Sequence, residues 1–194
     1  MLSCKKGLTT IFELRNYFQQ KDGLQTQISK QAYLQQRKRF LDIQIASVTD
    51  SENELAKKNL NHLKTVGMER PVTAIFDRGY PSLELIGFLE TEGISYLFRL
   101  SCNDYKAERR KMKPQDGIVH LGHTSARLSK IRKKHPERYK WMKEKRETTA
   151  RIPRSILPSG QELVLLTDLP VEVTAEQLAD LYYQRWEIEK KYHT

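Results

Sequence analysis

Between residues 41 and 100, short apolar runs alternate with amphipathic stretches, and this order constrains the fold of the 194-residue chain most strongly. The runs LDIQIASV, PVTAIFD and ISYLFRL predict three strands. SENELAKKNLNHLKTVG, which Gly67 ends, and PSLELIGFLETEG, which runs from Pro81 to Gly93, predict the two helices between them. Strands and helices that alternate in this way predict an α/β fold with at least one parallel pair of strands.

Two regions of different character complete the chain. Residues 1–40 predict a helical N-terminal region, because TTIFELRNYFQQ and ISKQAYLQQRKRF both have helical spacing and Asp22-Gly23 separates them. Residues 101–160 predict a basic insertion that is irregular, has weak β character and contains one basic helical run near residues 125–146. After this insertion, ELVLLTD predicts a fourth strand. The α/β core is therefore expected to comprise residues 41–100 and 161–194.

The last predicted helix combines apolar and ionic residues on one face. Thr174 and Gln177 predict a capping box at its start. On a period of 3.6 residues, one stripe is formed by Leu178, Tyr182, Arg185 and Glu189. Charges on a face that packs against a core are costly unless they are paired. The plainer interpretation is an Arg–Glu pair at i,i+4 spacing on a solvated helix.

Positive charge is concentrated in two blocks. The net charge of +10 divides into +6 over residues 1–40, −3 over 41–100, +10 over 101–151 and −3 over 152–194. Basic blocks of this kind favour a polyanionic partner, most often nucleic acid, although a solubilising surface has the same composition. The first block ends with the cations Arg37, Lys38 and Arg39. Two short helices with such an end suit a DNA-binding unit, and equally any small helical bundle.

Cysteine usage and hydropathy indicate the cellular compartment in which the chain is expected. Cys4 and Cys102 lie too far apart in sequence to form a metal motif, and two cysteines make no disulfide framework, which suits a reducing environment. The N-terminus carries no apolar segment typical of a signal peptide, and no apolar run approaches the roughly 20 residues of a membrane helix. We therefore expect a cytoplasmic protein without membrane contact.

Two carboxylates stand where a catalytic site would form. Asp77 ends the predicted buried strand, and ligands of α/β sheets bind at that edge. Glu189 lies on the last helix, which we expect to pack against the same sheet. An Asp and a Glu that face each other could bind Mg²⁺ or Mn²⁺, the ions that activate water or a 3′-hydroxyl in phosphodiester chemistry. Alternatively, Asp77 is a turn residue that caps its own loop.

The stretches FDRGYPSLELIGFL, around Asp77, and YYQRWEIE, around Glu189, resemble the DDE transposases of bacterial insertion sequences. The subgroup is insertion-sequence family four, whose signature reads Tyr-x2-Arg-x3-Glu-x6-Lys. The resemblance implies a ribonuclease-H-like core with an insertion, and Mg²⁺- or Mn²⁺-dependent cleavage and strand transfer of DNA. By this resemblance Asp77 and Glu189 are the second and third acids of the triad. Tyr182 and Arg185 would orient the glutamate and hold transposon-end DNA.

The chain departs from this family pattern at two places. The signature Lys would be residue 196, beyond Thr194. In the family pattern, the strand that carries the first Asp precedes the strand that LDIQIASV resembles. Here Phe40 runs directly into Leu41, so this segment is expected to be missing. Asp42, the only acid near this junction, is expected to point to solvent. We therefore predict an incomplete ribonuclease-H-like core, in which LDIQIASV and PVTAIFD pair directly as a parallel βαβ unit. Exposed strand edges would make such a core prone to dimerise.

Three functions follow as hypotheses. The first is a transposase, internally deleted and truncated, that acts on double-stranded DNA at transposon ends and targets and associates with the bacterial nucleoid. The second is a non-catalytic DNA-binding remnant that regulates transposition. The third is a basic structural protein that binds any polyanion.

Overall fold

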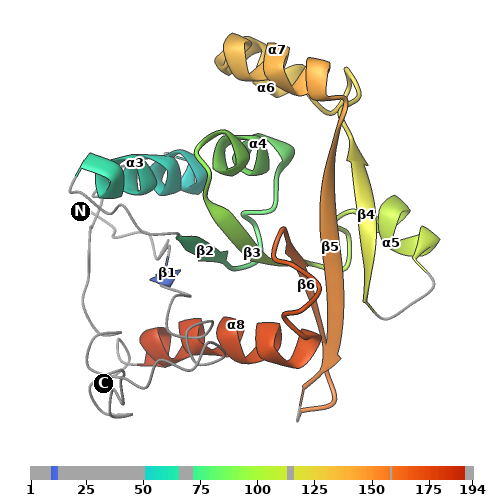
Figure 1. Cartoon of the computed structure of the whole chain (residues 1–194). Helices are drawn as coiled ribbons and strands as arrows, with labels where there is room; N and C mark the ends of the chain where they lie inside the picture. Colours follow the sequence, from blue (N-terminus) through green and yellow to red (C-terminus); the bar gives the residue numbers. More distant parts are fainter. Residues whose placement is uncertain (1–9, 13–50, 66–71, 113–115, 158, 191–194) are drawn as a thin grey trace.

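The computed structural model describes residues 10–12, 51–65, 72–112, 116–157 and 159–190, without the side chains of residues 10–12, 64 and 186–190 (Figure 1). The described strands form one sheet of six, in the order β1-β2-β3-β6-β5-β4. They are β1 (Thr10–Phe12), β2 (Thr73–Phe76), β3 (Ser95–Arg99), β4 (Asp116–Gly122), β5 (Glu147–Ile156) and β6 (Glu162–Thr167). The described helices are α3 (Glu52–Thr65), α4 (Leu83–Thr91), α5 (Lys106–Lys111), α6 (Ser129–Lys134), α7 (Pro136–Lys145) and α8 (Ala175–Lys190).

The predicted α/β unit is confirmed in the centre of this sheet. Strands β2 and β3 are parallel, with Ala74 opposite Tyr96, and α4 connects them. Ser82 is the N-cap of α4, where its side chain accepts a hydrogen bond from the backbone of Leu85. Gly93 follows the helix with φ of +66°, a conformation that favours glycine. Strand β6 pairs antiparallel with β3, so the sheet is mixed.

Helices cover both faces of the sheet, and Figure 1 shows α3 and α4 on one face and α8 on the other. The alternation of side chains along the strands explains this arrangement. Ala74 and Phe76 of β2 belong to the core cluster beneath α3 and α4, whereas Ile75 between them belongs to the cluster with α8. Burial on both faces accounts for the continuous apolar runs in the sequence of these strands.

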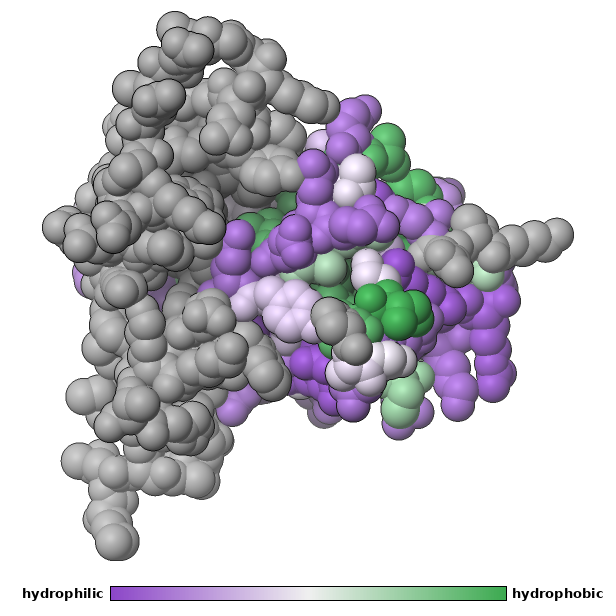
Figure 2. Space-filling model, turned by 90° about the horizontal axis from the view of Figure 1, so that it is seen from below, coloured by the Kyte–Doolittle hydropathy of each residue, from purple (hydrophilic) through white to green (hydrophobic). Residues whose placement is uncertain are grey.

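The face that carries α8 is polar where the structure describes it. Figure 2 views the molecule from this side, and hydrophilic residues dominate the coloured area, with smaller hydrophobic areas among them. The apolar positions of α8 are turned inward: Leu178 and Ala179 are buried in the cluster with Ile75. This packing fixes which face of α8 meets the sheet.

The N-terminal prediction was wrong where the structure describes it. Thr10–Phe12, expected within a helix, form strand β1, which pairs antiparallel with β2. A threonine, an isoleucine and a phenylalanine suit a strand, and the pairing satisfies an otherwise open edge of β2. In the described part of the chain, β1 and β3 occupy the two edges of β2, the strand with which residues 41–48 are predicted to pair directly. Residues 41–48 themselves lie outside the described residues.

The region from 101 to 160 is more regular than its sequence indicates. Strands β4 and β5 form a long antiparallel hairpin, and β5 also pairs with β6, so they extend the central sheet. Arg151 and Pro153 interrupt the apolar pattern of β5, so the alternation of apolar and polar residues that is typical of a strand is not visible in its sequence. The predicted basic helical run near residues 125–146 is confirmed as α6 and α7, which connect the two strands. No helix in the described part of the chain is long and apolar enough to cross a membrane.

Candidate functional site

Asp77 directly follows β2, as the sequence predicts, at the edge where parallel β3 also ends. The turn after it needs Gly79, whose φ is +95°. The amide of Asn53 on α3 donates hydrogen bonds to the carbonyl of Tyr80, at 3.4 Å, and to Oγ of Ser82, at 3.1 Å. These contacts hold the loop after β2, so the Asp77 side chain, 37% exposed, has a fixed place at the sheet edge.

Helix α8 is anchored at its start. The predicted capping box is confirmed: the backbone of Thr174 donates to Gln177 at 2.9 Å, and the backbone of Gln177 donates to Oγ1 of Thr174 at 3.3 Å. The buried guanidinium of Arg151 donates to the carbonyls of Pro170, at 2.8 Å, and Val173, at 2.7 Å. The turn between β6 and α8 is therefore tied to β5, which sets the position of the whole helix.

Two residues of the α8 stripe converge on Asp77. The Tyr182 hydroxyl donates a hydrogen bond to one Asp77 carboxylate oxygen at 2.7 Å. A guanidinium nitrogen of Arg185 lies 3.0 Å from the other oxygen and also donates to the Tyr182 hydroxyl at 3.1 Å. Tyr182 is 2% exposed and Arg185 is 3% exposed. The described part of the stripe, up to Arg185, therefore faces the core with the charge of Arg185 paired, and the alternative of a wholly solvated helix face is wrong for these residues.

Arg99 is a member of this site that the sequence analysis missed. It ends β3, next to β2, and its Cζ atom lies 5.7 Å from the centre of the Tyr182 ring. Cations within about 6 Å of an aromatic ring are attracted to its face. A signal was available in the sequence, because a charged residue closes the apolar run ISYLF at the same sheet edge as Asp77. Among the described side chains, Asp77, Arg99 and Arg185 thus bring one carboxylate and two guanidinium groups together.

The electrostatic environment keeps Asp77 ionised. Burial raises the pKa of its carboxyl group, but other contacts outweigh this effect and lower the pKa below its ordinary value. These contacts are the hydrogen bonds from Tyr182 and the backbone of Arg78, and the charges of Arg185 and Arg99. Burial and the hydrogen bond to Asp77 raise the pKa of Tyr182. Tyr182 is therefore a protonated donor at neutral pH.

The other predicted site residues are less completely described. Glu189 lies in α8 four residues after Arg185, one turn further along the same helix face, and its side chain is not among those described. Arg37, Lys38, Arg39 and Asp42 lie outside the described residues. The structure thus brings Tyr182 and Arg185 to Asp77.

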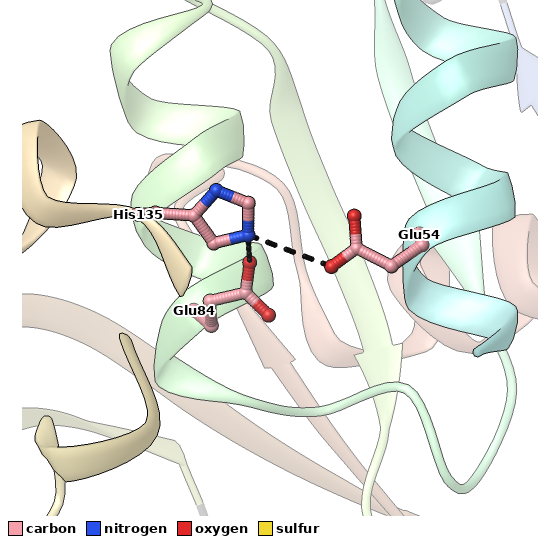
Figure 3. Close-up of side chains that lie close together, drawn as sticks. All are labelled: Glu54, Glu84 and His135. Carbon is pink, nitrogen blue, oxygen red and sulfur yellow. Dashed lines mark ion pairs between the residues drawn. The ribbon is translucent and has the colours of Figure 1, made fainter. Parts of the chain in front are cut away.

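A second group of possible metal ligands lies away from Asp77. Figure 3 shows Glu54 of α3, Glu84 of α4 and His135 directed toward one another, with ligand atoms within 4.8 Å. The buried ammonium of Lys57 already binds both glutamates, at 2.6 Å from Glu54. Arg138 lies 3.4 Å from Glu84. Because these cations already neutralise the carboxylates, the group is an ion-pair network that joins α3, α4 and the α6–α7 hairpin.

Comparison with known proteins identifies the family. Residues 12–194 match the family described as the transposase DDE domain. The chain belongs to the transposase DDE domain family. No curated protein and no solved structure was found to match it. The mixed α/β sheet is consistent with the ribonuclease-H-like fold of DDE transposases, and membership in the DDE family implies DNA as the substrate.

DDE transposases normally use divalent metal ions, but the described side chains fit such a site poorly. Hard cations need several oxygen ligands, and two-ion chemistry needs carboxylates around both ions. Asp77 is the single carboxylate among the described side chains of this site, and Tyr182 and Arg185 already engage its two oxygens. Arg99 adds further positive charge. The described part of the site around Asp77 therefore has an excess of cations, which suits an anionic ligand such as a phosphate group.

Proposed function

We propose that this chain is a transposase of the family-four type of bacterial insertion sequences that binds duplex DNA at the Asp77 site and lacks strand-transfer activity. The observation that carries the proposal is the convergence of Tyr182 and Arg185 on Asp77. Tyr and Arg at this spacing on α8 are the first two residues of the signature. Their contact with a strand-end aspartate joins the two segments on which the resemblance rests.

The guanidinium groups supply the affinity for DNA. Arg185 and Arg99 outnumber the carboxylate of Asp77, and the exposed Arg78 follows it. Guanidinium groups bind phosphates with two parallel hydrogen bonds, which orients the backbone as well as attracting it. We infer that one phosphate of a transposon end lies beside the half-buried Arg99 and the exposed Arg78, with the scissile bond near Asp77. The buried Arg185 holds Asp77 in place.

In this proposal the chain lacks one of the three acids that cleavage of DNA requires. Asp77 and Glu189 are the two acids that would hold Mg²⁺ or Mn²⁺, and the strand with the first Asp is missing between Phe40 and Leu41. Two carboxylates hold a pair of metal ions poorly, because the third normally bridges them. Asp42 is not expected to replace the missing acid. We therefore propose an internally deleted descendant of an active transposase, located with the nucleoid in the bacterial cytoplasm.

Binding of end DNA tests the proposal. Wild-type protein and Arg99→Lys are titrated with a labelled duplex that carries an inverted repeat from beside the gene, and with a scrambled duplex of equal length. Wild type should prefer the repeat. Arg99→Lys keeps the charge but loses the two-pronged geometry of the phosphate contact, so the affinity for both duplexes should fall by about tenfold, the size of a contact worth ~1.4 kcal/mol. Equal affinity of wild type for both duplexes would overturn the proposed recognition of ends.

A second function is a DNA-binding regulator of transposition. It is favoured by the two basic blocks, which a binding protein keeps without any need for a catalytic triad. Such a protein would compete with a complete transposase for the same ends. Loss of transposition in cells that express both proteins, with no effect from a variant that does not bind DNA, would support regulation. A chain that binds heparin and duplex DNA equally well would instead be a general polyanion binder.

A further inference from the structure

The α6–α7 hairpin carries more positive charge than its packing requires. Residues 129–146 contain nine Lys or Arg residues and two Glu residues, a net charge of +7. Figure 1 shows this hairpin at one end of β4 and β5, above α4. A concentration of one sign on so short a segment produces a strong local field.

The inner side of the hairpin is docked and neutralised. Met142 is fully buried, and Arg138 lies 5.2 Å from the centre of the Phe88 ring on α4. Lys145 pairs with Glu90 at 2.8 Å, and His135 lies 3.2 Å from Glu84. These contacts fix the orientation of the hairpin, so its outer side chains project from a rigid support.

The outer side of α6 is basic and has no acidic partner among the described residues. Ile131 is 3% exposed and turns inward. The neighbouring side chains are all exposed: Lys130, Arg132, Lys133 and Lys134. We refer to these four as the basic face. Lys130, Lys133 and Lys134 follow the i, i+3, i+4 spacing that places side chains along one helix surface. Their charge is therefore available to a partner.

The basic face lies toward the same end of the sheet as Asp77. Helix α7 runs in the same direction as α4, since His135 and Arg138 lie near Glu84 and Lys145 lies near Glu90. The end of α6 is therefore beside the beginning of α4. Leu83, where α4 begins, follows Asp77 by six residues, at most ~22 Å of extended chain. A duplex bound at Asp77 would be long enough to reach both places.

We propose that the basic face is a second contact for duplex DNA, which binds backbone phosphates on the flank of the segment held at Asp77. This inference rests on the proposed function, because it takes the same DNA as the partner. Duplex DNA presents one negative charge per ~1.7 Å, and a helix with cations on consecutive turns matches several of them. Lysines bind as point charges, so the contact adds affinity and orientation without reading sequence.

Salt dependence of binding tests the second contact. The full chain is titrated with a 30-bp duplex from 50 to 200 mM KCl without divalent metal, as wild type and as Lys130→Ala/Lys133→Ala/Lys134→Ala. Each lost phosphate contact should reduce the slope of log affinity against log salt by about 0.9, so the triple variant should lose about 2 to 3 in slope. The matched control is Lys106→Ala/Arg110→Ala/Lys111→Ala on α5, which removes three exposed charges elsewhere. This control should keep the wild-type slope.

The outcomes of these titrations test the basic face and the proposed function separately. An unchanged slope in the α6 variant, or an equal loss in both variants, overturns the basic face as a distinct contact. Tighter binding of single-stranded RNA than of duplex DNA overturns duplex DNA as its partner. If the α6 variant binds like wild type while Arg99→Lys loses affinity for end DNA, only this inference fails. Absence of duplex binding by wild type overturns the proposed function as well.

Discussion

The hydroxyl of Tyr182 donates a 2.7 Å hydrogen bond to the carboxylate of Asp77, across 105 residues of sequence. This bond joins α8 to the residue that directly follows β2. A hydrogen bond to a charged acceptor contributes about 1.5–3 kcal/mol, and Asp77 is partly exposed, so Tyr182→Phe should lower the free energy of unfolding by about 1–2 kcal/mol. Urea denaturation measures the change. Tyr183→Phe, one residue further and exposed, is the control and should leave it unchanged.

Arg185 and Asp77 should behave as a coupled pair. Arg185 is buried and its guanidinium lies 3.0 Å from Asp77, so Arg185→Met leaves the carboxylate without its closest cation. We expect a loss of about 2–3 kcal/mol, below the 3–5 kcal/mol of a fully buried pair, because solvent screens Asp77. In the background of Asp77→Asn the same substitution should cost at least ~1 kcal/mol less. Strictly additive losses would show that the two side chains do not interact.

The pH dependence of stability should report on Asp77. Its pKa in the folded protein is lowered below the ordinary value of 3.8, so the ionised form stabilises the folded state. This contribution is fully present above the unfolded pKa and is lost as the pH falls through the folded pKa. The stability difference between wild type and Asp77→Asn should therefore be constant above about pH 5 and shrink below pH 4. A difference that grows on acidification would contradict the assigned contacts.

Arg151 should be a major contributor to stability. Its side chain is 5% exposed, makes a two-pronged salt bridge with Asp116 and donates to the carbonyls of Pro170 and Val173. Arg151→Met leaves these acceptors unsatisfied and should cost about 3–5 kcal/mol. The control is Arg154→Met, three residues along β5, whose nearest acid Glu162 is exposed and 3.6 Å away. Arg154→Met should lower the free energy of unfolding by less than about 1 kcal/mol. Equal losses in the two variants would contradict the role given to Arg151.

Glu84 should hold the α6–α7 hairpin in place. It binds Lys57 and lies within 3.4 Å of Arg138 and 3.2 Å of His135. Glu84→Gln removes the negative charge that Lys57 and Arg138 share, so the hairpin should open more often and its lysines should be cut faster by trypsin. Limited proteolysis measures the rate. Glu137→Gln, an exposed change within α7, should leave the cutting rate as in wild type.

The sequence predicts the parts of this fold that depend on local pattern. The apolar run before Asp77, the capping box of Thr174 and Gln177, and the spacing of Tyr182 and Arg185 all depend on neighbouring residues, and the structure has each of them as predicted. The inward direction of the α8 stripe was open in the sequence. It is decided by Asp77, whose carboxylate makes burial of Arg185 tolerable.

Features that depend on distant partners were missed. Thr10–Phe12 form a strand because β2 offers them an open edge, which helical spacing in the surrounding residues does not reveal. Strand β5 carries Pro153, which lacks a donor for the ladder, and its Arg151 is buried only because Asp116 lies on the neighbouring strand. Arg99 likewise becomes a site residue through the contact with Tyr182 from a helix far along the chain.

Cleavage of transposon-end DNA tests the central claim most directly. Purified protein is incubated with a labelled duplex that carries the inverted repeat, with Mg²⁺ and separately with Mn²⁺, and the products are separated on a denaturing gel. Wild type and Asp77→Ala should both leave the duplex intact, because two carboxylates do not hold the pair of ions that strand cleavage requires. Efficient cutting by wild type that disappears in Asp77→Ala would contradict the account and establish an active transposase.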